Sequence, residues 1–245
     1  MSSLSYADQD ALWTGPLEDK LAHGRAAIQD ALAQAEHPVV LYTGGKDSTV
    51  VLWLVHQTAE RPQEIPTLLL DHGLHFPETW AFVERVQRDW DFELAIARND
   101  DVLAQASAPG SPRGVTTKHH TPRGEPIAVD QLNDENRHEI RDVLGYEAST
   151  FPFSLDTEVG NHLLKTVAMR RALRAQRFDY AFVGIRWDEH SARADEECLS
   201  PRSEPPHTRV HPILPLTEAD IWAVIRQYDL PTHPLYAQGY RSLDS

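Results

Sequence analysis

The amino-acid sequence predicts an α/β fold in which helices cover both faces of a mostly parallel central sheet. Between Leu17 and Ala97, short apolar runs typical of buried strands alternate with amphipathic segments. This alternation is typical of right-handed βαβ units. The chain also has 245 residues, 41% of them hydrophobic, which is enough for one such core. We therefore expect a single α/β domain over residues 1–245.

The first part of the chain contains the clearest elements. Leu17, Leu21, Ile28 and Leu32 recur at helical spacing and predict an N-terminal helix over residues 17–36. Further elements are expected in this order: a strand at 39–42, a buried helix at 48–60, a strand at 67–71, a helix at 77–90 that begins with proline, and a strand at 92–97.

An irregular insert is expected at about residues 101–160, where the alternation stops. Its prolines and glycines are concentrated in 103–127 and prevent a long regular element there, while one weak helix is expected over 130–144. The cations Arg113, Lys118 and Arg123 favour a mobile lid over an anionic ligand. A spacer without function is an equally good interpretation of this segment.

Regular structure is expected again in the last third of the chain. Periodicity predicts a helix over 162–176 and a strand over 180–184. Residues 209–214 are predicted to form an edge strand, because Pro212 has no N–H to donate to a neighbouring strand. Thr217 is expected to cap a helix that ends near Tyr228.

The composition argues against several classes of function. With 23 basic and 37 acidic residues, the formal net charge is −14, which disfavours binding to nucleic acid or to an anionic membrane. The N-terminus lacks the basic and apolar regions of a signal peptide, and no apolar run reaches the length of a membrane span. We therefore expect a cytoplasmic protein.

Cysteine and histidine usage gives no sign of a metal centre. The single cysteine, Cys198, excludes an intrachain disulfide, a cysteine-built zinc site and an iron–sulfur cluster within one chain. Among the 13 histidines, His72 and His75 are closely spaced, but no third ligand follows at a telling distance. No dedicated metal site is expected.

The strongest candidate site is the segment TGGKDST, Thr43–Thr49, which lies between a predicted strand and a predicted helix. Gly44 and Gly45 let the backbone turn and approach a ligand, and their N–H groups lie at the positive end of the helix dipole. Lys46, which we expect to be exposed in the loop, and the hydroxyls that follow it complete an anion site. The alternative interpretation is an ordinary glycine turn in which a polar residue caps the helix.

This loop resembles the SGGxDS pyrophosphate-binding signature of the adenine nucleotide α-hydrolases, or N-type ATP pyrophosphatases, with Thr43 in place of serine. Further segments resemble, in the same order, the group that contains the phosphoadenosine phosphosulfate (PAPS) reductases and the small subunit of sulfate adenylyltransferase. They are LLLDHGLHFPET (68–79), LKTVAMRRAL (164–173), GIRWDEHSAR (184–193), RVHPILPLTEADIW (209–222) and PLYAQGYRSL (234–243). The similarity covers about residues 38–100 and 160–243 and leaves out the insert.

The resemblance implies a nucleotide-binding domain whose substrates are ATP and a small oxyanion. Mg²⁺ is expected to enter bound to ATP. The residues expected to bind ATP and its phosphates are Thr43, Gly44, Gly45, Asp47, Ser48, Thr49 and Asp71. The residues expected to take part in catalysis are Lys46, Lys165, Arg186 and Arg193. Asp71 would end a parallel strand, where open α/β sheets bind ligands, and capping of a turn or helix is its alternative role.

The resemblance favours one of two activities. The first is transfer of AMP from ATP to an oxyanion, sulfate in this family, with release of pyrophosphate; it needs no side-chain nucleophile. The second, PAPS reduction, uses a cysteine near the C-terminus, whereas Leu243 is followed here by Asp244 and Ser245. Acidic neighbours are expected to raise the pKa of Cys198, which disfavours reduction.

A third interpretation is a nucleotide-binding subunit without catalysis. The resemblance also implies a GTPase large subunit as partner, with a homo-oligomer as the alternative.

Overall fold

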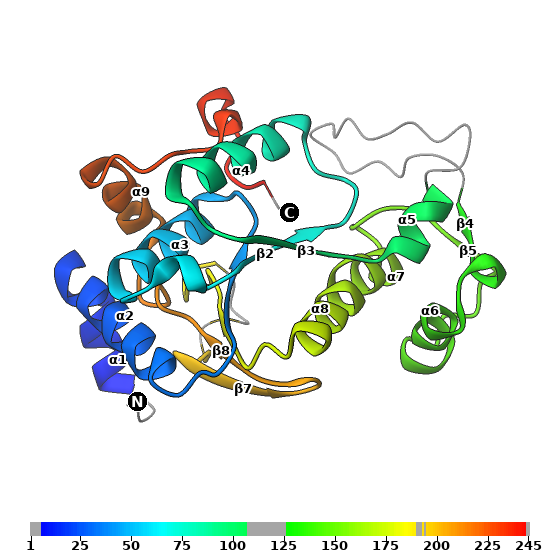
Figure 1. Cartoon of the computed structure of the whole chain (residues 1–245), viewed down its shortest axis with the longest axis horizontal. Coiled ribbons are helices and arrows are strands. Elements are labelled where there is room, and N and C mark those ends of the chain that lie inside the picture. Colours follow the sequence, from blue (N-terminus) through cyan, green and yellow to red (C-terminus); the bar gives the residue numbers. More distant parts are fainter. Residues whose placement is uncertain (1–5, 107–125, 190–192, 194, 244–245) are drawn as a thin grey trace. The chain divides into compact units, whose positions relative to one another are not determined.

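The structure, a computed structural model, describes residues 6–106, 126–189, 193 and 195–243. Among these residues, the main sheet has six strands in the order β3-β2-β1-β6-β8-β7, of which β2, β3, β7 and β8 are labelled in Figure 1. The parallel pairs are β1 with β2, β1 with β6 and β6 with β8, whereas β7 runs antiparallel to β8. The strands are β1 (Pro38–Tyr42), β2 (Thr67–Asp71), β3 (Leu94–Arg98), β6 (Tyr180–Phe182), β7 (Leu199–Ser203) and β8 (Pro206–Val210). The predicted mostly parallel α/β fold is confirmed.

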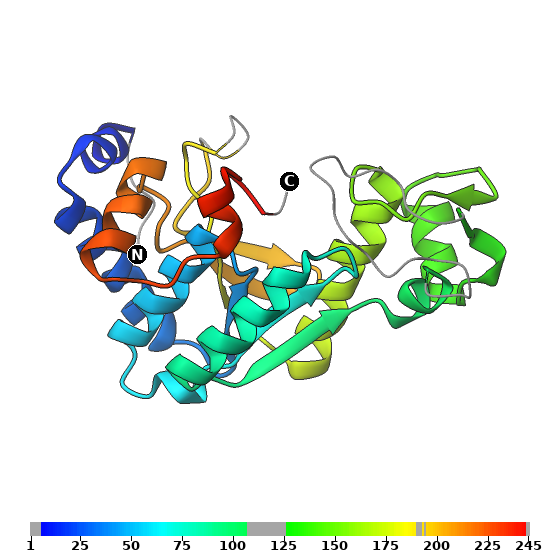
Figure 2. The same ribbon diagram turned by 90° about the horizontal axis from the view of Figure 1, so that it is seen from above.

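Helices surround this sheet. Helix α3 contacts strand β1 and the helices α2 and α9, an arrangement that can be followed in Figures 1 and 2. The apolar run from Val50 to Val55 is buried along its whole length, which explains why α3 is hydrophobic on every side. The helices named so far, with α1 and α4, are α1 (Tyr6–Thr14), α2 (Leu17–Leu32), α3 (Lys46–Thr58), α4 (Pro77–Trp90) and α9 (Glu218–Gln227). The N-terminal helix is confirmed with an earlier end, and α1 was not anticipated.

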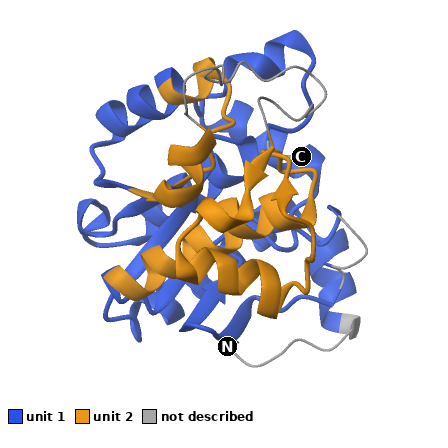
Figure 3. Cartoon of the chain, turned by 90° about the vertical axis from the view of Figure 1, so that its right-hand side faces the viewer, with its two compact units in different colours: residues 1–69, 81–95, 176–245 blue, residues 70–80, 96–175 orange. Residues whose placement is uncertain are grey.

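The chain divides into two compact units (Figure 3). Unit 1 consists of residues 1–69, 81–95 and 176–245, and unit 2 of residues 70–80 and 96–175. Each unit is therefore made of separate stretches of sequence. Whether the two act as the single domain expected from the sequence stays a prediction.

Unit 2 has a hydrophobic core of its own. This core includes Ile127, Leu132, Ile140, Phe151 and Leu163, all of which are buried. The described elements between β3 and β6 are α5 (Asp100–Ala106), β4 (Ile127–Ala128), a 3-10 helix (Val129–Gln131), α6 (Asp134–His138), a π-helical turn (Glu139–Val143), β5 (Thr150–Phe151), α7 (Glu158–Asn161), a second π-helical turn (His162–Val167) and α8 (Ala168–Gln176).

The expectation of an irregular insert over 101–160 is wrong for residues 126–160. The elements there are too short for sequence periodicity to detect, and a common apolar core holds them. The weak helix expected over 130–144 corresponds to α6 and the π-helical turn after it. Arg113, Lys118 and Arg123, on which the lid interpretation rests, lie outside the described residues.

Two expectations for the last third of the chain have opposite outcomes. Residues 209–214 do not form the edge strand, because β8 ends at Val210, before Pro212, and the polar strand β7 lies at the edge instead. The capping role of Thr217 is confirmed: its Oγ1 accepts the N–H of Asp220 at 3.2 Å, and the Asp220 carboxylate accepts the N–H of Thr217 at 2.9 Å.

Among the described residues, no helix has the length and apolar character that crossing a membrane requires.

A buried histidine just after β8 makes the stability of the fold depend on pH. The His211 side chain is fully buried, and burial lowers its pKa to about 4. The charge of Arg209 also lowers this pKa, whereas Glu196 raises it. The unfolded chain takes up this proton near pH 6.5, so the free energy of unfolding falls as the pH falls below that value.

We expect the free energy of unfolding to drop by about 2 kcal/mol between pH 7 and pH 5 because of this group. Urea unfolding at several pH values measures the drop. His211→Gln is expected to remove most of it, whereas the same change at exposed His37 serves as the control and keeps it. An equal pH slope in the wild type and in His211→Gln would contradict the assignment.

Candidate functional site

The loop between β1 and α3 is closed on itself by hydroxyl groups. Gly44 has a φ of +79°, in the left-handed region, so the tight turn predicted for the two glycines lies at Gly44. Gly45 is extended, with φ −76° and ψ 161°, and is the N-cap of α3. The Oγ of Ser48 accepts the Thr43 N–H at 3.2 Å and donates to the Gly45 carbonyl at 3.0 Å. Thr49 Oγ1 donates to the same carbonyl at 2.9 Å.

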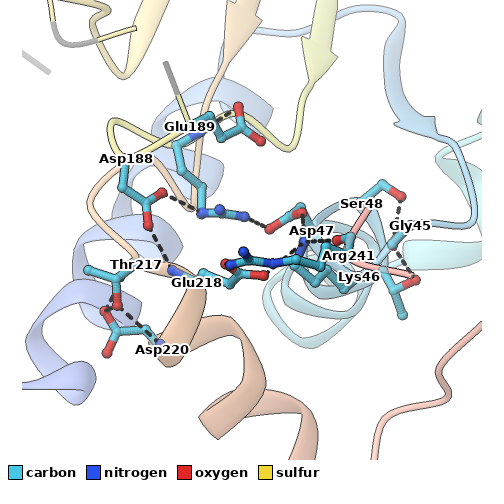
Figure 4. A network of polar contacts seen from close by, with 12 residues as sticks. Gly45, Lys46, Asp47, Ser48, Asp188, Glu189, Thr217, Glu218, Asp220 and Arg241 are labelled. Carbon is cyan, nitrogen blue, oxygen red and sulfur yellow. Dashed lines mark hydrogen bonds and ion pairs between the residues drawn. The ribbon is translucent and has the colours of Figure 1, made fainter. Parts of the chain in front are cut away.

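Lys46 is buried in this loop, with 7% of its side chain exposed, so the expectation of an exposed lysine is wrong. Its Nζ donates to the Arg241 carbonyl at 3.2 Å and lies 3.3 Å from Asp47 and 3.7 Å from Glu218. Its backbone N–H donates to the hydroxyl of Tyr236 at 2.9 Å. Figure 4 shows Lys46, Asp47, Glu218 and Arg241 gathered at the N-terminus of α3.

The charge of Lys46 is set by its surroundings. Burial is the largest cause that lowers its pKa, and the neighbouring Arg186 lowers the pKa further. Glu218 and Glu189 act in the opposite direction. A buried ammonium group has lost most of its water, so it binds an anion that takes the place of that water more strongly than an exposed one would.

Arg186 connects the loop to the segment that follows β6. One of its Nη atoms forms an ion pair with Asp47, and its Nε donates to Asp188 at 2.8 Å. Only 6% of its side chain is exposed. The backbone of this segment passes close to the loop at Gly184, where a Cβ would lie only 3.1 Å from the backbone of Asp47 and of Ser48. Asp188 also accepts the N–H of Glu218 at 2.8 Å.

The charges of this network nearly cancel. Its members are three cations, Lys46, Arg186 and Arg241, and four carboxylates, Asp47, Asp188, Glu189 and Glu218. A polyphosphate that enters the site therefore needs either the release of carboxylates or a cation of its own. Among the described residues, no three metal-ligating side chains come together.

The structure brings together only part of the predicted site. Thr43, the two glycines, Lys46, Asp47, Ser48, Thr49 and Arg186 lie in one network. Arg193 is seen elsewhere in unit 1, where its carbonyl accepts the N–H of Glu196 at 3.0 Å and its charge lowers the pKa of Arg209 after the larger effect of burial.

The two remaining site predictions fall in unit 2. Lys165 lies in the second π-helical turn and is partly buried. Asp71 ends β2, and its carboxylate accepts the N–H of Gly73 at 2.9 Å, which is the turn-capping alternative. Their proposed roles toward a nucleotide are untested.

Sequence reasoning missed Glu218, Tyr236 and Arg241. All three contact Lys46, either directly or through each other, although they lie far from it in the sequence. They belong to the segments 209–222 and 234–243, which resemble the PAPS reductase group. That resemblance was a usable signal for function, but spacing alone does not place these residues at the loop.

Cys198 is poorly suited to act as a nucleophile. Burial raises the pKa of its thiol to about 12, and the negative charge of Asp30 acts in the same direction. The thiol donates to the carbonyl of His211 at 3.5 Å. The expected direction is confirmed, but the main cause is burial rather than the adjacent acidic run.

We therefore expect Cys198→Ser to leave turnover within about twofold of the wild type, because a protonated thiol at this position contributes no charge. Steady-state kinetics of the full chain measure this effect. Serine is more polar than cysteine and Cys198 is partly buried, so a thermal melt should accompany the assay. A fall to a few per cent of wild-type turnover in a folded variant would show that the thiol takes part.

The fold and the loop define the class of protein. A mostly parallel sheet whose strand β1 leads through a TGGKDST loop into a helix N-terminus is the adenine nucleotide α-hydrolase fold. The chain belongs to the phosphoadenosine phosphosulfate reductase domain family, which it matches over residues 37–124 and 130–244. This match includes most of residues 101–160, so the expectation that the resemblance leaves out this segment is wrong.

Curated relatives carry the name of one subunit of an enzyme. The chain is 30% identical over 238 residues to sulfate adenylyltransferase subunit 2 of Methylorubrum populi, across 87% of this chain and 63% of that protein. It is 31% identical over 234 residues to the protein of the same name from Methylobacterium radiotolerans, across 85% and 60%. The chain thus spans less than two thirds of the length of these relatives.

Solved structures of the same fold include PAPS reductase from Candida auris in a phosphate complex. It has a TM-score of 0.58 and 16% identity and covers 99% of this chain and 96% of that chain. FMN adenylyltransferase from Candida glabrata in complex with ATP has a TM-score of 0.60 and 14% identity, over 96% and 66%. At these identities, the likeness concerns the fold.

Proposed function

We propose that this chain is an ATP-binding adenylyltransferase of the sulfate adenylyltransferase small-subunit type. It transfers AMP to a small oxyanion, with sulfate as the substrate expected from the relatives. The observation that carries this proposal is the buried Lys46 at the N-terminus of α3, joined through Asp47 to a buried Arg186. Such a pair of buried cations suits a reaction whose leaving group is pyrophosphate.

The loop would hold the leaving group. In the proposed reaction, an oxygen of the oxyanion forms a bond to the α-phosphorus of ATP, and the bond between that phosphorus and the bridging oxygen breaks. Pyrophosphate leaves with the electron pair, so negative charge develops where Lys46 and the helix dipole of α3 stabilise it. No proton transfer to a side chain and no covalent enzyme intermediate are required.

Arg186 would neutralise the adenylyl phosphate or the incoming anion. It can do so by exchanging one of its carboxylates, Asp47 or Asp188, for an oxyanion of the substrate. Because the network carries one carboxylate more than it has cations, we propose that ATP brings Mg²⁺ as its counter-ion. Phosphate oxygens, water and a single carboxylate are a usual ligand set for this ion.

The name of the relatives implies a second subunit, and we propose a GTPase large subunit as the partner of this chain. A homo-oligomer is the alternative, and a cytoplasmic location stays a prediction. Since the relatives are named as one subunit of an enzyme, the first assay of activity includes a candidate large subunit.

Sulfate-dependent exchange of labelled pyrophosphate into ATP tests the proposal. The full chain is assayed with Mg²⁺, with and without a candidate large subunit. Exchange that requires sulfate supports the adenylyltransferase. Thiol-dependent release of sulfite from PAPS, without exchange, would support the reductase instead, and nucleotide binding with neither activity would indicate a non-catalytic subunit.

A further inference from the structure

One face of the hairpin formed by β7 and β8 carries an unusual set of side chains. In this antiparallel pair, Ser200 lies opposite Arg209 and Arg202 lies opposite His207. Residues directly opposite each other point to the same face, and so do residues two apart on one strand. Ser200, Arg202, His207 and Arg209 therefore share one face, called the hairpin face below.

Positive charge on the hairpin face exceeds the negative charge that it meets. Arg202 forms bonds of 3.1 and 3.2 Å with the two carboxylate oxygens of Glu196. The charges of Arg202 and Arg193 lower the pKa of Arg209 after the larger effect of burial, and Glu196 partly compensates. Among the described contacts, Arg209 is thus close to two further arginines, Arg202 and Arg193, and to the carboxylate of Glu196, and the three guanidinium groups repel one another.

Hydrogen-bonding groups on the hairpin face are also left over. Within the described part of the chain, the Nε atoms of Arg202 and Arg209 are buried and have no hydrogen-bond partner. His207 is engaged on one side, since its Nδ1 lies 2.7 Å from the carbonyl of Pro205. Buried donors are normally paired, so unpaired guanidinium nitrogens beside surplus charge favour a ligand that accepts hydrogen bonds.

The two arginine side chains of the hairpin face are partly open to solvent, whereas His207 is buried. The Arg202 side chain is 37% exposed, and Arg209 is partly exposed. β7 lies at the edge of the sheet, where nothing in the described chain pairs with its outer side (Figure 1). A small ion can therefore approach the exposed parts of both arginine side chains from solvent.

We propose that the hairpin face binds a small tetrahedral oxyanion of the sulfate or phosphate type, held by the guanidinium groups of Arg202 and Arg209. Glu196 occupies Arg202 in the absence of this anion and competes with it. The planar guanidinium group matches the geometry of two oxygens on one such ion. This site shares no residue with the network at α3, and the proposal does not depend on adenylyl transfer.

The test must separate this site from the loop, which is itself expected to bind anions. Binding of inorganic sulfate and of inorganic phosphate is therefore measured by calorimetry in full-length Lys46→Met, at an ionic strength held constant with chloride. Saturable binding of either ion is expected to persist. Loss of all oxyanion binding in Lys46→Met would place the anion at the loop and overturn the proposal.

Three variants in the Lys46→Met chain then locate the ion. Arg202→Gln and Arg209→Gln are each expected to weaken binding about tenfold or more. Arg88→Gln, a change at a largely exposed arginine of α4, is the matched control and should bind as before. The proposal fails if Arg202→Gln and Arg209→Gln bind the ion as tightly as Arg88→Gln does. If these two variants also self-associate while their affinity for the ion is unchanged, the arginines only protect the sheet edge.

Glu196→Gln keeps the proposal testable if the arginine variants do not fold. This change removes the competing charge but retains the shape of the side chain, so binding should tighten several-fold. A merely structural role of the arginines predicts no gain in affinity. Unchanged or weaker binding in folded Glu196→Gln would therefore overturn the proposal, and comparison of sulfate with phosphate identifies the preferred ion.

Discussion

Lys46→Met is expected to reduce pyrophosphate exchange by about 100- to 1000-fold, the usual effect of removing one group that stabilises developing charge. Methionine keeps the apolar stem of the lysine and removes only the ammonium group. The neighbouring carboxylates keep partners, because Asp47 retains Arg186 and Glu218 retains Arg241. Stability should therefore change much less than activity does.

Lys20→Met is the matched control for this prediction. Lys20 is also a buried lysine of unit 1, with an ion pair of 2.7 Å to Asp220, but it belongs to α2 and does not contact the loop in the described contacts. Its loss should destabilise the fold and leave the affinity for ATP unchanged. Equal losses of exchange activity in the two variants would mean that Lys46 acts only through stability.

Arg186→Met is expected to destabilise the fold by about 3–5 kcal/mol and to abolish exchange. This substitution removes the guanidinium group that joins Asp47 and Asp188, so that, among the described contacts, Asp47 keeps only Lys46 and Asp188 keeps only the backbone N–H of Glu218. Urea unfolding at pH 7 measures the first effect, and exchange at a temperature where the variant is folded measures the second.

Arg186→Lys separates the two roles of this residue. A lysine restores the charge, but its single nitrogen cannot bond two carboxylates in the fork geometry of arginine. We expect most of the stability and little of the activity to return. Full activity in Arg186→Lys would show that charge alone matters at this position and would contradict the bidentate arrangement.

The parts of the fold that are set by residues adjacent in the sequence were predictable from the sequence. The strand–helix alternation, the loop and the Thr217 cap are local patterns, and the structure has them in place. Strand β7 was not predictable in this way, because LSPRS contains a proline and lacks apolar alternation. Its place in the sheet comes from its pairing with β8.

The candidate site shows the same division. The residues of the loop follow from its motif, whereas the burial of Lys46 does not. Lys46 is buried because Tyr236 and Arg241, which are almost two hundred residues away, come to lie on it. Spacing along one segment contains no information about such contacts, and only the resemblance to a family pointed to those segments.

Tyr236 and Arg241 have a further consequence for any ligand of the loop. They accept hydrogen bonds from the backbone nitrogen and the side-chain nitrogen of Lys46, so an anion that binds there competes with the chain itself for these donors. Binding is then an exchange of partners, and the observed dissociation constant equals the intrinsic one divided by the fraction of molecules whose donors are released. The polypeptide and the phosphate are competitors for the same two nitrogen atoms.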